Sequence, residues 1–260
     1  MSTHDELAQM LMREHAAGTR FHPLGPGSGV ADLAAAYGVQ RRFVQLMGAT
    51  AGAAAGYKIG LTSARMQKMC GIDQPVAGVV FGTRVMKSGV VLQARRYHHL
   101  GLEFEVGVRL GRDLPRDRGP FTREQVAAAV DGVCAAVEVV DDRNADYATL
   151  EALSLIADNS WNAGAVLGAF AKTWDKLEDA SGIVWVNGQE IDRGYGRDVL
   201  GHPFVPLTWL ANHLAAAGDA LRAGDIVLTG SLITTRFPKE AGAFRYELAG
   251  IGAVELTVAF

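Results

Sequence analysis

Two glutamates with a spacing that suits metal ligands, Glu103 and Glu105, lie in a segment that alternates between apolar and polar residues over 100–110. Because successive side chains of a strand point to opposite faces, we expect both carboxylates on one face, about 7 Å apart at the backbone. Like charges this close repel unless a cation lies between them, and carboxylate oxygens are ligands that Mg²⁺ and Mn²⁺ prefer. The same pattern also fits a half-buried strand whose polar face is solvated.

A third carboxylate, Glu138, stands inside the apolar run 133–140, which predicts a buried strand. A charge in such a place is normally paired or bound to a metal. An ion pair with Arg143 is one explanation. The other is that Glu103, Glu105 and Glu138 form an open site on two strands for one divalent ion, with its remaining positions left to water or substrate.

Lys58 lies among apolar neighbours in the predicted strand 57–61. A partly buried lysine can bind a carboxylate, or it can act as an acid or base if its pKa falls. A surface lysine on an edge strand would have the same neighbours in sequence. We name position 74, in the turn Asp73-Gln74-Pro75, as a second catalytic position and expect an acidic group there.

The polar turn at 158–162 precedes a short apolar segment, 163–168, that predicts a strand. We expect Asp158, Asn159, Ser160 and Trp161 to bind substrate, since a turn at the end of a sheet is well placed to face a cavity. Most such turns only reverse the chain, and Trp161 could instead fill the core or a subunit contact. His202 precedes a helix and is expected to cap it.

The elements that must position these residues begin with two predicted helices, 3–16 and 30–47, so that residues 1–55 form an N-terminal helical segment. From 56 to 260 strands dominate, with Ser63 as the expected N-cap of a short helix that ends at Gly71. A capping box opens a helix at 122–130, and an Asn-Gly hairpin at 187–188 and a helix at 207–217 follow. Helices come in blocks and do not alternate regularly with strands, which favours an α+β domain. We expect 56–260 to be the catalytic domain.

Composition excludes several classes of function. The 260 residues are 49% hydrophobic and 20% charged, with a net charge of −3, which argues against a nucleic-acid partner. No apolar run approaches the length of a membrane span, and a polar start without an apolar stretch predicts no signal peptide. With two distant cysteines, Cys70 and Cys134, a reducing cytoplasmic location is expected. Walker, nucleophile-elbow, HExxH and dinucleotide motifs are not found in the sequence.

Taken together, these segments resemble the 2-keto-4-pentenoate hydratase and 4-oxalocrotonate decarboxylase branch of the fumarylacetoacetate hydrolase superfamily. The pieces that carry the resemblance follow in the expected order over nearly the whole chain, at 56–63, 103–105, 138–143, 158–159, 200–203 and 224–231. The resemblance implies a mixed β-roll fold, with Mg²⁺ or Mn²⁺ on Glu103, Glu105 and Glu138. It also implies a substrate 2-oxo-carboxylate that chelates this ion beside Lys58.

As an activity, the resemblance implies addition of water to a 2-hydroxy-2,4-dienoate, giving a 4-hydroxy-2-oxo acid in meta-cleavage breakdown of aromatic compounds. The small acid would be the substrate, and the chain would form a homo-oligomer; a paralogous decarboxylase is a further candidate partner. Trp161 departs from the small residues common in relatives, which leaves open the alternatives of 4-oxalocrotonate-type decarboxylase and acylpyruvate-type C–C hydrolase. A non-catalytic partner subunit is the alternative outside enzymes.

Overall fold

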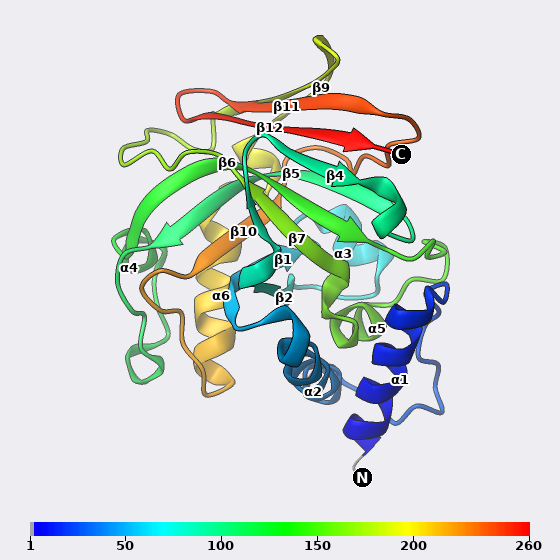
Figure 1. Ribbon diagram of the computed structural model, residues 1–260. Coiled ribbons are helices and arrows are strands. Elements are labelled where there is room, and N and C mark those ends of the chain that lie inside the picture. The colour runs from blue at the N-terminus through cyan, green and yellow to red at the C-terminus, as the bar shows by residue number, and fades with distance from the viewer. Residues whose placement is uncertain (1–2) are drawn as a thin grey trace.

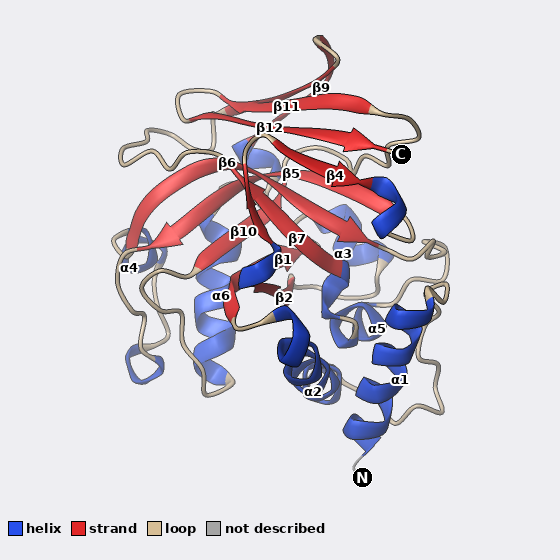
Figure 2. Ribbon diagram, in the orientation of Figure 1, coloured by secondary structure: helices blue, strands red, loops and turns tan. Residues whose placement is uncertain are grey.

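The computed structural model describes residues 3–260, and Figures 1 and 2 show strands above a layer of helices. The helices are α1 (Thr3–Ala17), α2 (Leu33–Ala51), α3 (Ala64–Met69), α4 (Arg123–Ala127), α5 (Ala152–Ala157) and α6 (Phe204–Ala216). The strands are β1 (Ala54–Gly60), β2 (Val76–Phe81), β3 (Val85–Lys87), β4 (Val90–Gln93), β5 (Leu100–Leu110), β6 (Val130–Asp141), β7 (Asn162–Leu167), β8 (Ser181–Val186), β9 (Gln189–Tyr195), β10 (Ile226–Ser231), β11 (Gly242–Leu248) and β12 (Gly252–Ala259).

The strands form two mixed sheets. Seven strands follow the order β2-β1-β10-β5-β6-β7-β3, and five follow β4-β12-β11-β8-β9. Most neighbours run antiparallel, but β1 pairs with β10, β3 with β7 and β4 with β12 in parallel. The five-stranded sheet lies at the top of Figure 1, with α1, α2 and α6 on the opposite side of the molecule. The expected α+β fold with mixed sheets and an N-terminal helical segment is confirmed.

The alternation in β5 decides which side of the sheet holds core and which holds carboxylates. Its apolar side chains, among them Leu102, Phe104 and Val106, are fully buried. The ring of Phe104 meets that of Tyr246 on β11 at 5.5 Å, so this face packs against the five-stranded sheet. Glu103 and Glu105 therefore point to the opposite face, where the short helices lie.

Several local signals are confirmed by the structure. Ser63 caps α3 by accepting a hydrogen bond from Met66 N, and Thr122 closes the capping box that opens α4. At the β8–β9 hairpin, Asn187 and Gly188 have φ of 51° and 83°, the left-handed geometry that an Asn-Gly turn requires. His202 lies just before Pro203, the N-cap residue of α6, and its Nδ1 accepts a hydrogen bond from the N–H of Phe204, the first residue of the helix.

Other elements differ from the expected ones. Helix α4 ends at Ala127, because β6 already begins at Val130. Helix α2 begins at Leu33, where the carboxylate of Asp32 accepts a hydrogen bond from Ala35 N and fixes the start. The strands β2 and β11 were not expected from the sequence.

The N-terminal helices are joined to the strands by polar contacts as well as by packing. Gln40 on α2 is buried and donates to the carbonyl oxygens of Ala77 on β2 and Ile156 on α5, at 2.7 and 2.8 Å. Burial of this amide is tolerable because both bonds are made. Among the helices of residues 3–260, none is long and apolar enough to cross a membrane.

Candidate metal and substrate site

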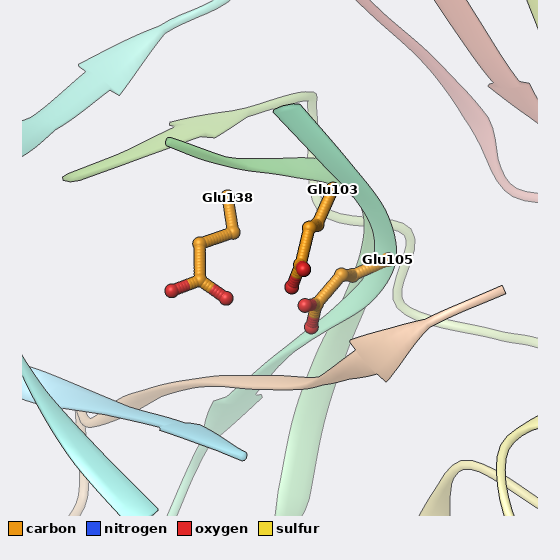
Figure 3. A group of neighbouring side chains, drawn as sticks. All are labelled: Glu103, Glu105 and Glu138. Atoms are coloured by element: carbon orange, nitrogen blue, oxygen red, sulfur yellow. The ribbon is translucent and has the colours of Figure 1, made fainter. Parts of the chain in front are cut away.

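The register of two central strands places the three glutamates together. In the antiparallel pair of β5 and β6, Glu103 lies opposite Glu138, and Glu105 lies opposite Ala136. One carboxylate oxygen from each glutamate lies within 4.8 Å of the others. Figure 3 shows Glu103 and Glu105 projecting side by side from β5 while Glu138 faces them. The structure thus brings together all three predicted ligands.

Each of these carboxylates is held at one oxygen. Oε2 of Glu105 accepts from Gly230 N at 2.7 Å, and Oε1 of Glu138 accepts from Asn162 Nδ2 at 2.9 Å. Oε1 of Glu103 accepts from the hydroxyl of Thr235 at 2.6 Å. Among the described residues, Oε1 of Glu105 is buried without a hydrogen bond, and Oε2 of Glu138 has the ammonium group of Lys58 beside it at 3.2 Å. Oxygens that are oriented but unsatisfied suit a divalent cation, so the residues fit Mg²⁺ or Mn²⁺.

Gly230 is required for this arrangement. Its φ of 113° lies in a region that other residues rarely adopt, and a Cβ there would stand 2.1 Å from the hydroxyl oxygen of Thr62. The close approach of β10 to Thr62 is thus possible only at a glycine. The same backbone conformation aims the Gly230 amide at Glu105.

The electrostatics of the cluster point the same way. Burial raises the pKa of Glu105 well above its usual value, and the charges of Glu138 and Glu103 raise it further. Burial also raises the pKa of Glu138 to about 7, against the lowering effect of Lys58. Burial and the neighbouring carboxylates thus disfavour the ionised forms of these two glutamates, and Lys58 offsets this only in part. A divalent cation among them would supply the missing positive charge.

Lys58 belongs to the same cluster. Its side chain is buried, and its Nζ lies 3.2 Å from Oε2 of Glu138. Burial works against its positive charge, but Glu138, Glu103 and Glu105 together raise its pKa above the usual value. A surface position for Lys58 is therefore wrong. The expected Glu138–Arg143 pair is wrong too, since Lys58 is the cation beside Glu138.

A cavity of about 470 Å³ opens beside the cluster. Lys58 and Glu103 lie in its wall together with the backbone of β1. The remaining wall is contributed by α3, by the segment before α5, by the turn after α5 and by the loop after β10. Its lining also includes Arg65, Met66, Met69, Tyr147, Leu150, Leu155, Ser160, Trp161, Asp198, Thr235 and Phe237.

The turn after α5 has an unusual backbone. Asn159, Ser160 and Trp161 have φ of 52°, 49° and 59°, three consecutive left-handed residues that cost strain unless their surroundings hold them. The Asp158 carboxylate holds one end, 2.7 Å from Arg143 Nη1 and 2.5 Å from His15 Nε2. The Asn159 amide exchanges two hydrogen bonds with the backbone of β2.

This geometry divides the four residues expected to bind substrate. The side chains of Asp158 and Asn159 are engaged within the protein and do not line the cavity, so the structure gives them a supporting role. Ser160 and Trp161 do line it. Among the described residues, the Ser160 hydroxyl and the Trp161 indole N–H are buried without a hydrogen-bond partner.

The expectation of an acidic group at position 74 is wrong. The residue there is Gln74, and its Oε1 accepts a hydrogen bond from Trp209 Nε1 at 3.2 Å. The neighbouring Asp73 is exposed, and neither residue lines the cavity. Asn162 and Thr235, which orient two of the carboxylates, were not predicted from the sequence. Asn162 could have been recognised as a polar residue next to an apolar strand segment. Thr235 lies in a loop, where no pattern in the sequence indicates its role.

Relatives extend over nearly the whole chain. A protein of Burkholderia vietnamiensis named 2-keto-4-pentenoate hydratase is 31% identical over 262 residues, covering 99% of each chain. Another of Dechloromonas aromatica, 2-keto-4-pentenoate hydratase 1, is 32% identical and covers 95% of this chain and 94% of its own. The fold matches that of 4-oxalocrotonate decarboxylase from Pseudomonas putida G7, solved with magnesium and adipate, with a TM-score of 0.90, 24% identity and coverage of 98% and 97%.

The sequence model described as fumarylacetoacetate (FAA) hydrolase C-terminal matches residues 61–259. This range contains all three clustered glutamates, the turn at 158–161 and the strand β10 that orients Glu105. Lys58 and the helices α1 and α2 lie before it. Since the match extends over well more than half of its length, the chain belongs to the fumarylacetoacetate hydrolase family.

Proposed function

We propose that this protein is a metal-dependent hydratase that adds water to a 2-hydroxy-2,4-dienoate in the meta-cleavage breakdown of aromatic compounds. The observation that carries the proposal is the cluster of three glutamates, two of them fully buried, with Lys58 at the wall of a cavity. The full-length similarity to proteins named as hydratases supports this choice of reaction.

Glu103, Glu105 and Glu138 would hold the ion, for which Mg²⁺ or Mn²⁺ is the candidate. When bound, such an ion supplies Lewis-acid polarisation of a carbonyl and a charge for the substrate carboxylate. Gly230, Asn162 and Thr235 keep the three carboxylates oriented. Protein groups that orient ligands in this way keep the site in shape before the substrate arrives.

Lys58 would hold the carboxylate of the substrate or transfer a proton to the dienol as it becomes the ketone. Its ammonium group is fixed by Glu138 at the cavity wall, so a bound anion would gain a charge-assisted hydrogen bond. Water then adds its oxygen to the distal alkene carbon, and its proton goes to the neighbouring carbon. The product is a 4-hydroxy-2-oxo acid, and all atoms of both reactants are retained.

A panel of 2-hydroxydienoates with Mg²⁺ or Mn²⁺, combined with CO₂ detection, tests the proposal. Hydration predicts loss of the dienol absorbance without release of CO₂. Release of one CO₂ per substrate would assign a decarboxylase instead, and formation of two shorter acids would assign a C–C hydrolase. Binding of neither metal nor substrate would point to the non-catalytic subunit.

We also propose that the protein works as a homo-oligomer in the cytoplasm. Val91 on the edge strand β4 and Phe260 after the neighbouring β12 are 54% and 58% exposed, an apolar edge suited to self-association. Both cysteines are free and buried, which fits a reducing compartment. Light scattering of the purified protein tests the assembly, with a monomeric mass as the contrary result.

A further inference from the structure

The cavity has two ends of different chemistry. At one end lie Lys58 and Glu103, with the Thr235 hydroxyl bonded to Glu103. Ser160 belongs to this end, because the preceding residue Asn159 lies against Gly78 next to the Lys58 side chain. In the proposed function, on which this inference rests, this end of the cavity binds the 2-oxo-carboxylate group of the substrate, its head.

Away from this head end, the wall is apolar. Met66 and Met69 belong to α3, and Leu155 belongs to α5. Leu150 lies just before α5, and Phe237 lies in the loop after β10. The two short helices close this end together, since Ala152 N donates to Cys70 O at 3.2 Å. A substrate tail that leaves the head end therefore meets methionine, leucine and aromatic side chains.

The polar groups in this wall do not suit a second carboxylate. The Tyr147 hydroxyl already donates to Asp142 at 3.1 Å, and the Trp161 indole offers one neutral donor, which does not offset a buried charge. Apart from Lys58, Arg65 is the one cation among the described residues that line the cavity. Arg65 is exposed, and Asp198, also exposed in the same wall, carries the opposite charge.

We propose that the substrate of this protein is a 2-hydroxydienoate with an uncharged apolar tail, and that a tail ending in a carboxylate is rejected. The cavity volume of about 470 Å³ lies within the range that holds ligands of drug size, and it leaves room for a tail beyond a five-carbon acid. The apolar wall defined by Met66, Met69, Leu150, Leu155 and Phe237 would contact that tail.

Two seven-carbon acids test the proposal without relying on turnover. 2-Oxoheptanoate and 2-oxoheptanedioate share the same head and length and differ only in whether the tail ends in a methyl or a carboxylate group. We expect calorimetric titration of the Mg²⁺-loaded protein to give a Kd at least about 100-fold lower for 2-oxoheptanoate, a ratio typical of an apolar pocket that rejects a polar isostere. Equal affinities, tighter binding of the diacid, or no binding of either acid would overturn it.

Three variants show which residues discriminate between the two acids. Met66→Arg places a cation in the apolar wall and should reduce the Kd ratio at least about tenfold, because a tail carboxylate gains a close charge pair. Met66→Leu, of similar volume, should keep the ratio. If Met66→Arg leaves the ratio unchanged, this wall does not contact the tail. If Arg65→Gln weakens the diacid selectively, Arg65 binds the tail carboxylate and the proposal is wrong.

These outcomes are separable from failure of the proposed function. A panel without turnover, together with a Kd ratio in favour of 2-oxoheptanoate, would overturn the proposed reaction and leave the inference about the tail standing. A Kd ratio in favour of the diacid would overturn the inference about the tail, whereas metal-dependent hydration would still support the proposed function.

Discussion

Replacing Trp161 with alanine should change both stability and substrate preference, because the indole is shared between core and cavity. It is 6% exposed, meets Phe21 edge-on at 5.0 Å and Tyr147 at 5.8 Å, and yet lines the cavity. Truncation of a buried tryptophan costs about 3–5 kcal/mol. Because the indole N–H makes no hydrogen bond and one side of the ring borders the cavity, we expect a loss at the lower end of this range, about 3 kcal/mol.

The same substitution enlarges the apolar part of the cavity. Relative kcat/KM should move toward dienoates with longer tails by about tenfold or more, the usual effect of one methylene in an apolar pocket. Denaturant unfolding measures the free energy, and competition between a short and a long 2-hydroxydienoate measures the preference.

Trp209→Ala is the matched control for this variant. Trp209 stacks on His213 at 5.0 Å and is bonded to Gln74, away from the cavity. Its truncation should lower stability and leave the substrate ranking unchanged. If Trp161→Ala behaves like this control, Trp161 only fills the core and the reasoning about a shared indole fails.

Three further variants probe the site and its support. Glu105→Gln should abolish metal-dependent turnover while circular dichroism shows an intact fold. Glu247→Gln, a half-buried glutamate on β11 outside the cluster, should keep turnover. Full activity of Glu105→Gln would refute the ligand set. Lys58→Met should lower kcat/KM by at least about 100-fold, and unchanged kinetics would remove Lys58 from the site. Arg143→Met leaves the buried Asp158 charge without its cation and should lower the free energy of unfolding by about 3–5 kcal/mol in denaturant titration; a change below about 1 kcal/mol would contradict that role.

Local patterns predicted the parts of the fold whose causes are local. The alternation over 100–110 predicted β5 and the common face of Glu103 and Glu105, because strand geometry alone fixes it. Capping residues Ser63 and Thr122 predicted the starts of two helices for the same reason. The strand β11 was missed although its buried residues alternate, since charged residues interrupt a short apolar pattern.

The contacts that complete the site could not be predicted, because they join distant segments. The Asp158 carboxylate is held by Arg143 and by His15, which lies 143 residues earlier on α1. The position of Glu103 opposite Glu138 depends on the register between β5 and β6, which no local spacing reveals. The sequence therefore suggested candidate ligands, and the tertiary fold decided which side chains face the cavity.

The central claim, hydration that depends on the three-glutamate site, is tested most directly by product analysis before and after metal removal. The purified protein is treated with EDTA, assayed on 2-hydroxypenta-2,4-dienoate, and assayed again after Mg²⁺ or Mn²⁺ is restored. We predict no turnover in EDTA and, once metal is returned, formation of 4-hydroxy-2-oxopentanoate with no CO₂. Full turnover in EDTA, or a product that has lost one carbon as CO₂, would contradict the claim.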